Sequence, residues 1–239
     1  MSTIKKIPKR HQPKGFEILY EDRDLIIGNK VPGYLSVRAL WEKENTIHAA
    51  LNRYVRKGDP KSRKRVYVVH RLDQDTSGVL VYAKSVEVQQ FLKDDWKNTK
   101  KIYYAVVLGR LAHKAGTITG YLYEDEDYRV HSTHDTQRGK LAHTRYKVIK
   151  ETGKYSLVTI DLLTGKKNQI RVHFADVGHP VAGDTKYGTG KSKQERLALH
   201  ARAITLTHPF SGKRLTVEAP VPEIFHKLVG EIKVISDKG

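Results

Sequence analysis

The chain has 239 residues, of which 44 are Lys or Arg and 26 are Asp or Glu, so its formal net charge is +18 at pH 7. A surplus of this size indicates a polyanionic partner, because each neutralised phosphate releases condensed counterions. The absence of Cys excludes a disulfide framework, a thiolate nucleophile and Cys-ligated zinc. No signal peptide or apolar run of membrane-spanning length is visible, so we expect a cytoplasmic protein.

The N-terminal part of the chain begins with a basic stretch and continues with short apolar runs. Residues 1–14 carry several cations and two prolines but no acid, so we expect a flexible basic arm. Strands are predicted at Phe16–Tyr20 and Leu25–Asn29, separated by an acidic turn. A helix is predicted from about Asn45, where apolar residues recur at helical spacing.

A strongly basic segment follows this helix. Residues 56–65 contain six cations and one acid around Pro60. Such a run between a helix and a strand is either a solvated loop or a site of phosphate contact, and the sequence favours neither.

Strand-like segments dominate the rest of the chain. Ser85 is a candidate cap for a helix, and the acidic cluster 124–127 is typical of an exposed hairpin. The later predicted strands are Ile102–Leu108, Thr117–Leu122, Ala142–Ile149, Ser156–Leu163, Ala198–Leu206 and Arg214–Glu218, with helices at Lys167–Val177 and Pro222–Val229. Many strands with few helices predict an α+β fold on a mixed, largely antiparallel central sheet. We expect one catalytic domain over 15–230 and a C-terminal tail at 231–239.

The most informative stretch is the loop His70–Gly78, with the sequence His-Arg-Leu-Asp-Gln-Asp-Thr-Ser-Gly. Strand-like apolar runs flank it, and loops fixed by rigid strands are frequent positions for catalytic groups. The loop resembles the signature His-Arg-Leu-Asp-x-x-Thr-Ser-Gly of the RluA-type RNA pseudouridine synthases, which isomerise uridine within RNA. Five or more specified positions at fixed spacing make this resemblance specific.

Other segments extend the resemblance over roughly residues 16–225. Lys101–Ala105 matches the strand motif Lys-x-Tyr-x-Ala of that family, and Thr164–His173 resembles its Gly-Arg-x-His-Gln-Ile-Arg-Val-His motif. Two residues depart from the pattern, since Lys166 stands where Arg is usual and Asn168 where His is usual. RluA-type enzymes often carry an N-terminal S4 domain, and here we expect a stand-alone catalytic domain.

The resemblance assigns the catalytic roles. It implies that Asp73 is the ionised carboxylate that attacks C1′ of the uridine or removes its 2′ proton. Asp75, the competing acid, falls on a variable position of the motif. Arg171 is implied as the counter-charge of Asp73, because burial alone raises the pKa of a carboxyl group. Tyr103 is implied to stack on the uracil and to take part in proton transfer at C5.

A second set of residues is implied to face the RNA. The target uridine must leave its stack, and the planar guanidinium of Arg71 can fill the vacated space. We group His70 with Arg71, as a residue that anchors the loop rather than an acid or base. Lys167 and Asn168, in the later motif, are further candidate RNA contacts.

The resemblance predicts a cofactor-free isomerase that acts as a monomer on structured RNA, either ribosomal or transfer RNA, with no metal, nucleotide cofactor or membrane partner. One alternative is a catalytically idle RNA-binding protein on the same scaffold. Retention of Asp73, Arg171 and Tyr103 together argues against it, because binding alone does not need these three residues. Another is a metal-dependent RNA-cleaving enzyme, but the twelve His residues show no convincing metal-ligand spacing.

Overall fold

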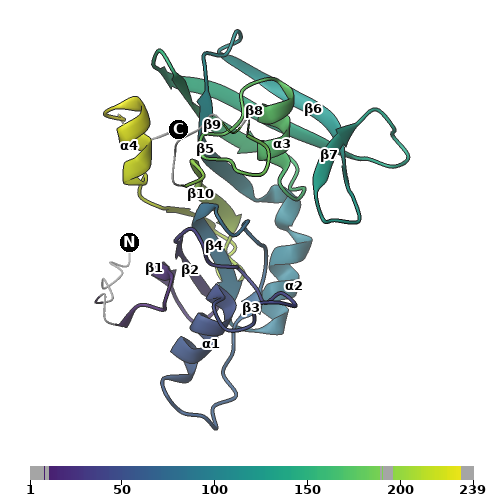
Figure 1. The fold of residues 1–239 in the computed structure, drawn as a ribbon. Helices are drawn as coiled ribbons and strands as arrows, with labels where there is room; N and C mark the ends of the chain where they lie inside the picture. Colours follow the sequence, from purple (N-terminus) through teal and green to yellow (C-terminus); the bar gives the residue numbers. More distant parts are fainter. Residues whose placement is uncertain (1–7, 9–10, 189, 191–195, 233–239) are drawn as a thin grey trace. The chain divides into compact units, whose positions relative to one another are not determined.

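The computed structural model describes residue 8, residues 11–188, residue 190 and residues 196–232 (Figure 1). The chain divides into two compact units, one formed by 1–102 with 201–220 and the other by 103–200 with 221–239. The predicted basic arm and C-terminal tail fall largely outside the described residues. The single domain over 15–230 stays a prediction.

The first unit is built on a sheet with its apolar residues in the centre. Its strands run in the order β1 (Phe16–Glu21), β2 (Leu25–Lys30), β4 (Ser77–Ala83) and β10 (Leu199–Thr207), with β3 (Tyr67–Val68) beside β4 and β11 (Arg214–Glu218) beside β10. The pairs β1–β2, β2–β4, β3–β4 and β10–β11 are antiparallel. Every residue of β4 is buried, which explains the continuous apolar run Val79–Ala83 within it.

Two helices and a short 3₁₀ turn complete the first unit: α1 (Ile47–Arg56), α2 (Val86–Asp94) and η2 (Trp96–Asn98). The hydroxyl of Ser85 accepts a hydrogen bond from the backbone N–H of Val88 at 3.2 Å, which confirms the predicted cap. Thr46 caps α1 in the same way. Helix α2 packs on β3 and β4, and its Leu92 enters the apolar core between Val79, Val81 and their neighbours.

The second unit is a strand-rich layer with helix α3 packed on it. Its strands run in the order β5 (Lys100–Leu108), β9 (Tyr155–Leu162), β8 (Lys140–Glu151), β6 (Ala115–Glu124) and β7 (Val130–Thr133). Helix α3 (Gln169–Asp176) contacts β6, β7 and β8, and α4 (Glu223–Val229) contacts β9 (Figure 1). The first residues of β5 and of β10 belong to the other unit.

These elements confirm the predicted α+β fold, and the pairs β6–β7, β6–β8 and β8–β9 are antiparallel as expected. The acidic cluster lies in the hairpin between β6 and β7, of which β7 itself was not predicted. Among the described residues, no helix is both long enough and apolar enough to cross a membrane.

Candidate active site

The signature loop connects β3 to β4 in the first unit, and its backbone is fixed on both sides of Asp73. The N–H of Leu72 donates to Oγ of Ser36 at 3.0 Å, and that hydroxyl donates back to the Leu72 carbonyl at 2.8 Å. On the other side, the carbonyl of Gln74 accepts from the N–H of Gly33 at 2.9 Å. Asp73 therefore lies between two neighbours that segment 31–36 holds in place.

Lys30 adds a buried cation to this arrangement. Its side chain is fully buried at the end of β2. Its ammonium donates to the carbonyl oxygens of Gln74 at 2.6 Å, Tyr34 at 2.8 Å and Val31 at 3.1 Å. One charged group thus ties the signature loop to the turn after β2. The sequence alone did not predict this role of Lys30.

Exposure distinguishes the two acids of the loop. Asp73 is half-buried, and its carbonyl accepts a hydrogen bond from the N–H of Thr76 at 3.1 Å, which closes a turn. Asp75 is exposed, as is Arg71. A half-buried carboxylate on a pinned turn is better suited than an exposed one to react at a defined position.

His70 holds the start of the loop as a neutral ring. Its Nε2 accepts a hydrogen bond from the N–H of Val81 at 3.1 Å, so that nitrogen carries no proton. The ring also lies 4.7 Å from that of Trp96, measured between centroids. Burial, together with the charge of Lys101, lowers the pKa of His70 to about 3. His70 is therefore an anchor, and its RNA-side grouping with Arg71 stays a prediction.

In the second unit, Arg171 lies on α3 and is buried. It forms a two-point ion pair with Asp184, in which Nε donates to Oδ2 and Nη2 donates to Oδ1, both at 2.8 Å. Burial opposes the ionisation of Asp184, but the hydrogen bonds and charge of Arg171 outweigh it and hold the pKa of that carboxyl below its usual range. The sequence alone did not predict the pairing of Arg171 with Asp184.

The N-terminus of α3 is shaped by Asn168, one of the departures from the family motif. Its backbone is left-handed, with φ of 53°, a conformation that asparagine adopts more readily than most residues. Its side-chain oxygen accepts a hydrogen bond from the hydroxyl of Tyr187 at 3.2 Å. The ring of Tyr187 also faces the guanidinium of Arg171 at 5.3 Å. Asn168 thus helps to place the aromatic ring beside Arg171.

Lys167 and Tyr103 are the other predicted site residues of the second unit. The ammonium of Lys167 forms an ion pair with Glu124 and donates to the carbonyl of Tyr128 at 2.9 Å. Its role as an RNA contact stays a prediction, as does that of Asn168. Tyr103 lies on β5 and is buried. Because Asp73 belongs to the first unit, its pairing with Arg171 and its proximity to Tyr103 stay predictions.

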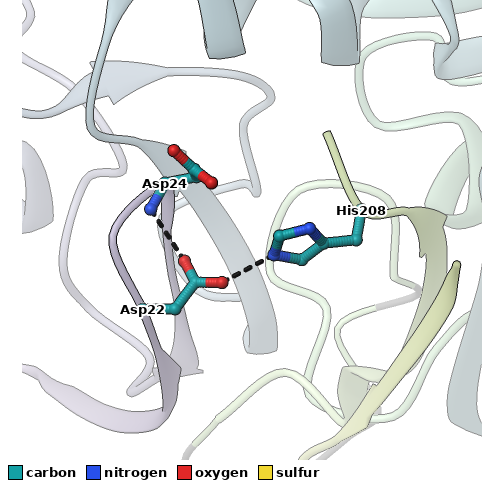
Figure 2. Close-up of side chains that lie close together, drawn as sticks. All are labelled: Asp22, Asp24 and His208. Carbon is teal, nitrogen blue, oxygen red and sulfur yellow. Dashed lines mark hydrogen bonds and ion pairs between the residues drawn. The ribbon is translucent and has the colours of Figure 1, made fainter. Parts of the chain in front are cut away.

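One further cluster has the composition of a metal site. Ligand atoms of Asp22, Asp24 and His208 lie within 4.8 Å of one another (Figure 2). The carboxylate of Asp22 already accepts from His208 Nε2 at 2.6 Å, from the Tyr20 hydroxyl at 2.7 Å and from two backbone N–H groups. Nδ1 of His208 accepts from two backbone N–H groups after β10. These contacts fit a clamp between two turns rather than a ligand set.

Comparison with known proteins gives a consistent result. Residues 24–176 match the sequence profile of the family described as RNA pseudouridylate synthase. The uncharacterized RNA pseudouridine synthase YjbO of Bacillus subtilis is 33% identical over 221 residues, which cover 91% of this chain and 77% of that protein. Ribosomal large subunit pseudouridine synthase D of Nitrosomonas europaea is 36% identical over 235 residues, or 91% of this chain and 65% of that protein.

Solved structures show the same fold. The human protein RNA Pseudouridylate Synthase Domain Containing 4 superposes with a TM-score of 0.73 at 23% identity, over 87% of this chain and 89% of that one. Human RNA Pseudouridylate Synthase Domain Containing 1 gives a TM-score of 0.69 at 25% identity, over 86% and 83%.

Proposed function

The chain belongs to the RNA pseudouridylate synthase family, and from that premise we propose which residues convert uridine to pseudouridine and on which RNA. It is an RNA pseudouridine synthase, and its reaction is an isomerisation. The observation that carries the assignment is the signature loop, where hydrogen bonds fix both neighbours of a half-buried Asp73. Asp73 is the reacting carboxylate.

The reaction breaks the C1′–N1 bond, rotates the uracil and forms a bond from C5 to C1′. C5 loses its proton and N1 gains one, so atoms and electrons balance without a co-substrate. Asp73 either attacks C1′ or takes the 2′ proton to give a glycal, and both routes require the ionised form. Retention of the uracil in a site protected from water then permits the rejoining of the two fragments.

Arg171 is the counter-charge of Asp73. A guanidinium has five N–H donors, more than one carboxylate can use, so a single arginine can serve Asp184 and a second acid. Tyr103 stacks on the uracil and takes part in proton transfer at C5. Arg71, exposed on the signature loop, fills the space that the flipped uridine leaves.

The substrate is large-subunit ribosomal RNA. Several relatives at 32–36% identity are named ribosomal large subunit pseudouridine synthase D, and they support this choice over transfer RNA. The net charge of +18 supports a polyanionic substrate of either kind. Mapping of pseudouridines in ribosomal and transfer RNA from cells with and without the protein identifies the target, and a change confined to transfer RNA would overturn the ribosomal choice.

The test of the reacting residue compares two acids of one loop. Asp73→Asn keeps the shape of the side chain but removes the carboxylate, so we expect no release of tritium from RNA labelled at uridine C5. Asp75→Asn is the control, because it makes the same substitution at the exposed acid of the same loop. We expect this variant to keep its activity. Sustained turnover by Asp73→Asn, or loss of turnover in Asp75→Asn alone, would refute the assignment.

The same experiment addresses the idle-scaffold alternative. A protein that only binds RNA releases no label in its wild-type form, and its RNA affinity is independent of Asp73. We expect Asp73→Asn to bind RNA as tightly as the wild type, because the substitution keeps the backbone hydrogen bonds on both sides of residue 73 and leaves the surface cations unchanged.

A further inference from the structure

A tight hairpin after β2 exposes two large apolar side chains at its tip. The N–H of Ala39 donates to the carbonyl of Glu42 at 2.8 Å, and the N–H of Glu42 donates back to Ala39 at 3.4 Å. Leu40 and Trp41 occupy the turn between them, with exposed fractions of 91% and 80%. Among the described residues these are the two most exposed large apolar side chains. Hairpin turns ordinarily carry Gly, Asn or Asp, so turn formation does not explain this pair.

The base of this 39–42 hairpin is anchored to the candidate active-site loop. Ser36, three residues before Ala39, exchanges two hydrogen bonds with Leu72, the residue before Asp73. The carbonyl of Ser36 also accepts from the buried hydroxyl of Tyr82 at 2.6 Å. On the other side, the carboxylate of Glu42 accepts from the chain at 44–45 and so fixes the return path. The hairpin is therefore a defined projection from the same part of the first unit as Asp73.

The charges around the tip favour a polyanion. Arg38 and Lys43 flank the hairpin, and both are exposed. The two nearby acids are engaged by local groups, since Glu42 accepts backbone and amide hydrogen bonds and Glu44 pairs with Arg53 at 3.2 Å. An exposed aromatic ring between two cations is the combination that binds unpaired nucleotides, with the ring stacking on a base and the cations meeting phosphates.

We propose that the 39–42 hairpin is a docking arm on which an unpaired nucleobase of the substrate RNA, close to the target uridine, stacks against Trp41. Leu40 packs on the neighbouring sugar, and Arg38 and Lys43 contact the flanking phosphates. The proposal rests on the proposed function and adds to it the element that receives the strand beside the reacting nucleotide.

A second copy of the chain fits the tip less well than RNA does. A large aromatic side chain buries about 150–250 Å², so even Leu40 and Trp41 of both copies together stay below the roughly 1,000 Å² of total buried surface that a specific protein interface needs. The flanking cations would also repel their own copies in a symmetric contact. An RNA base can stack on Trp41 with a smaller contact area, and its phosphates neutralise Arg38 and Lys43.

The first test measures steady-state kinetics on total RNA labelled with [5-³H]uridine, taken from cells that lack this protein. Loss of one stacked base weakens binding by roughly 5- to 100-fold, so Trp41→Ala raises KM by that factor and changes kcat by less than about threefold. Trp41→Phe keeps an aromatic ring, so its KM stays closer to the wild-type value than to that of Trp41→Ala. Phe210→Ala is the control, because Phe210 is an aromatic residue with 75% exposure in the turn between β10 and β11. Its KM stays at the wild-type value.

The second test reads the stacking directly. The chain has two Trp residues, so a variant with Trp96→Phe reports on Trp41 alone, and Asp73→Asn in the same chain prevents turnover. We expect RNA to quench the fluorescence of Trp41. The dependence of RNA affinity on salt is unchanged in Trp41→Ala, whereas a double Arg38→Ala and Lys43→Ala variant lowers its slope by about two ions.

The outcomes separate this proposal from the catalytic one. A wild-type KM in Trp41→Ala, together with an absence of quenching, would overturn the docking arm while an inactive Asp73→Asn still upheld the reaction. If the wild type is a dimer and Trp41→Ala is a monomer, the exposed hairpin binds a second copy of the chain, and the proposal is also overturned.

Discussion

At the scale of single residues, Arg171 shows how a buried cation is made stable. Two parallel N–H···O contacts to Asp184 match the planar guanidinium to a carboxylate, and the backbone N–H groups of Lys186 and Tyr187 also donate to that carboxylate at 2.9 Å. Both charges are out of water, so each depends on the other. The ion pair fixes α3 relative to the segment that follows it.

Removal of this carboxylate should be strongly destabilising. We expect Asp184→Asn to lower the free energy of unfolding by about 3–5 kcal/mol, because it removes the charged partner of both printed hydrogen bonds of the buried Arg171 guanidinium. Denaturant unfolding measures the loss. Asp176→Asn is the control on α3, because Asp176 is exposed and its replacement by a neutral amide should cost little. Equal stabilities of the two variants would contradict the role of the pair.

His70 should make stability depend on pH. Its pKa is about 3 in the folded chain against about 6.5 in an unfolded one, so the unfolded state binds more protons between these values. The stabilising contribution of the neutral His70 is fully present above the unfolded pKa of about 6.5 and is lost as the pH falls toward the folded pKa of about 3. From pH 7 to pH 5 this residue contributes a loss of about 2 kcal/mol.

The measurement is the free energy of unfolding at pH 7 and at pH 5, for the wild type and for His70→Gln. A glutamine can still accept the N–H of Val81 but does not titrate. The variant should lose about 2 kcal/mol less than the wild type over this range. Parallel pH profiles of the two proteins would mean that His70 is not held neutral.

At the scale of elements, the final glycine of the signature is required by strand packing. Gly78 is the second residue of β4 and has φ of +114°, and a Cβ there would lie 2.2 Å from the carbonyl oxygen of Ala201 on the neighbouring β10. No rearrangement of a side chain can relieve this contact, because the atom belongs to a backbone in the sheet. The motif therefore ends in glycine because β10 approaches its backbone.

Gly78→Ala should weaken the sheet of the first unit. We expect a loss of roughly 2–5 kcal/mol from the disfavoured φ and the overpacking together, measured by thermal or denaturant unfolding. Gly33→Ala separates the two causes, because its φ is +89° and no atom lies within 4 Å of its Cβ position. It should cost about 1 kcal/mol. A Gly78→Ala variant no less stable than Gly33→Ala would refute the steric argument.

The sequence predicted the elements whose signals are local. Ser85 caps α2 as expected, and the apolar run of β4 is a buried strand. Strand β7 was missed because Val130–Thr133 is short and polar and forms by pairing with β6. Helix α3 begins two residues later than predicted, since the left-handed backbone of Asn168 cannot continue a helix.

The same distinction between local and remote signals applies to the candidate active site. The motif identified the signature loop and Asp73, since motif residues are contiguous. The residues that hold that loop are remote in sequence: the ammonium of Lys30 reaches Gln74, and Ser36 reaches Leu72. The partner of Arg171 within its own unit is Asp184, thirteen residues away and without a charge pattern that singles it out. Such contacts depend on the folded backbone, so a single sequence does not reveal them.

At the scale of the whole molecule, part of the surplus positive charge lies in one continuous segment. The six cations of segment 56–65 are all exposed, and its one acid, Asp59, accepts a hydrogen bond from the N–H of Lys61. A groove of about 450 Å³ lies beside the segment, flanked by Arg56 and Arg65. The structure thus presents this segment to solvent, where phosphates can reach it.

If these cations contact RNA, their removal should change the salt dependence of binding. We expect the double variant Arg56→Ala and Arg65→Ala to lower the slope of log affinity against log salt by about two, with kcat unchanged. Lys227→Ala is the control, because Lys227 is exposed on α4 and pairs with Glu223 at 3.1 Å. If the double variant has the same salt dependence as the wild type, segment 56–65 is a solvated loop that does not contact RNA.

The division of the chain into two units also constrains how it is made. The first unit needs 201–220, which supply β10 and β11, but the ribosome completes the second unit's residues 103–200 before it reaches them. Until then β4 has an apolar edge that lacks its neighbour β10. Such an edge is prone to wrong pairing, so the nascent protein is most vulnerable to aggregation in the interval between synthesis of β4 and release of β11 from the exit tunnel.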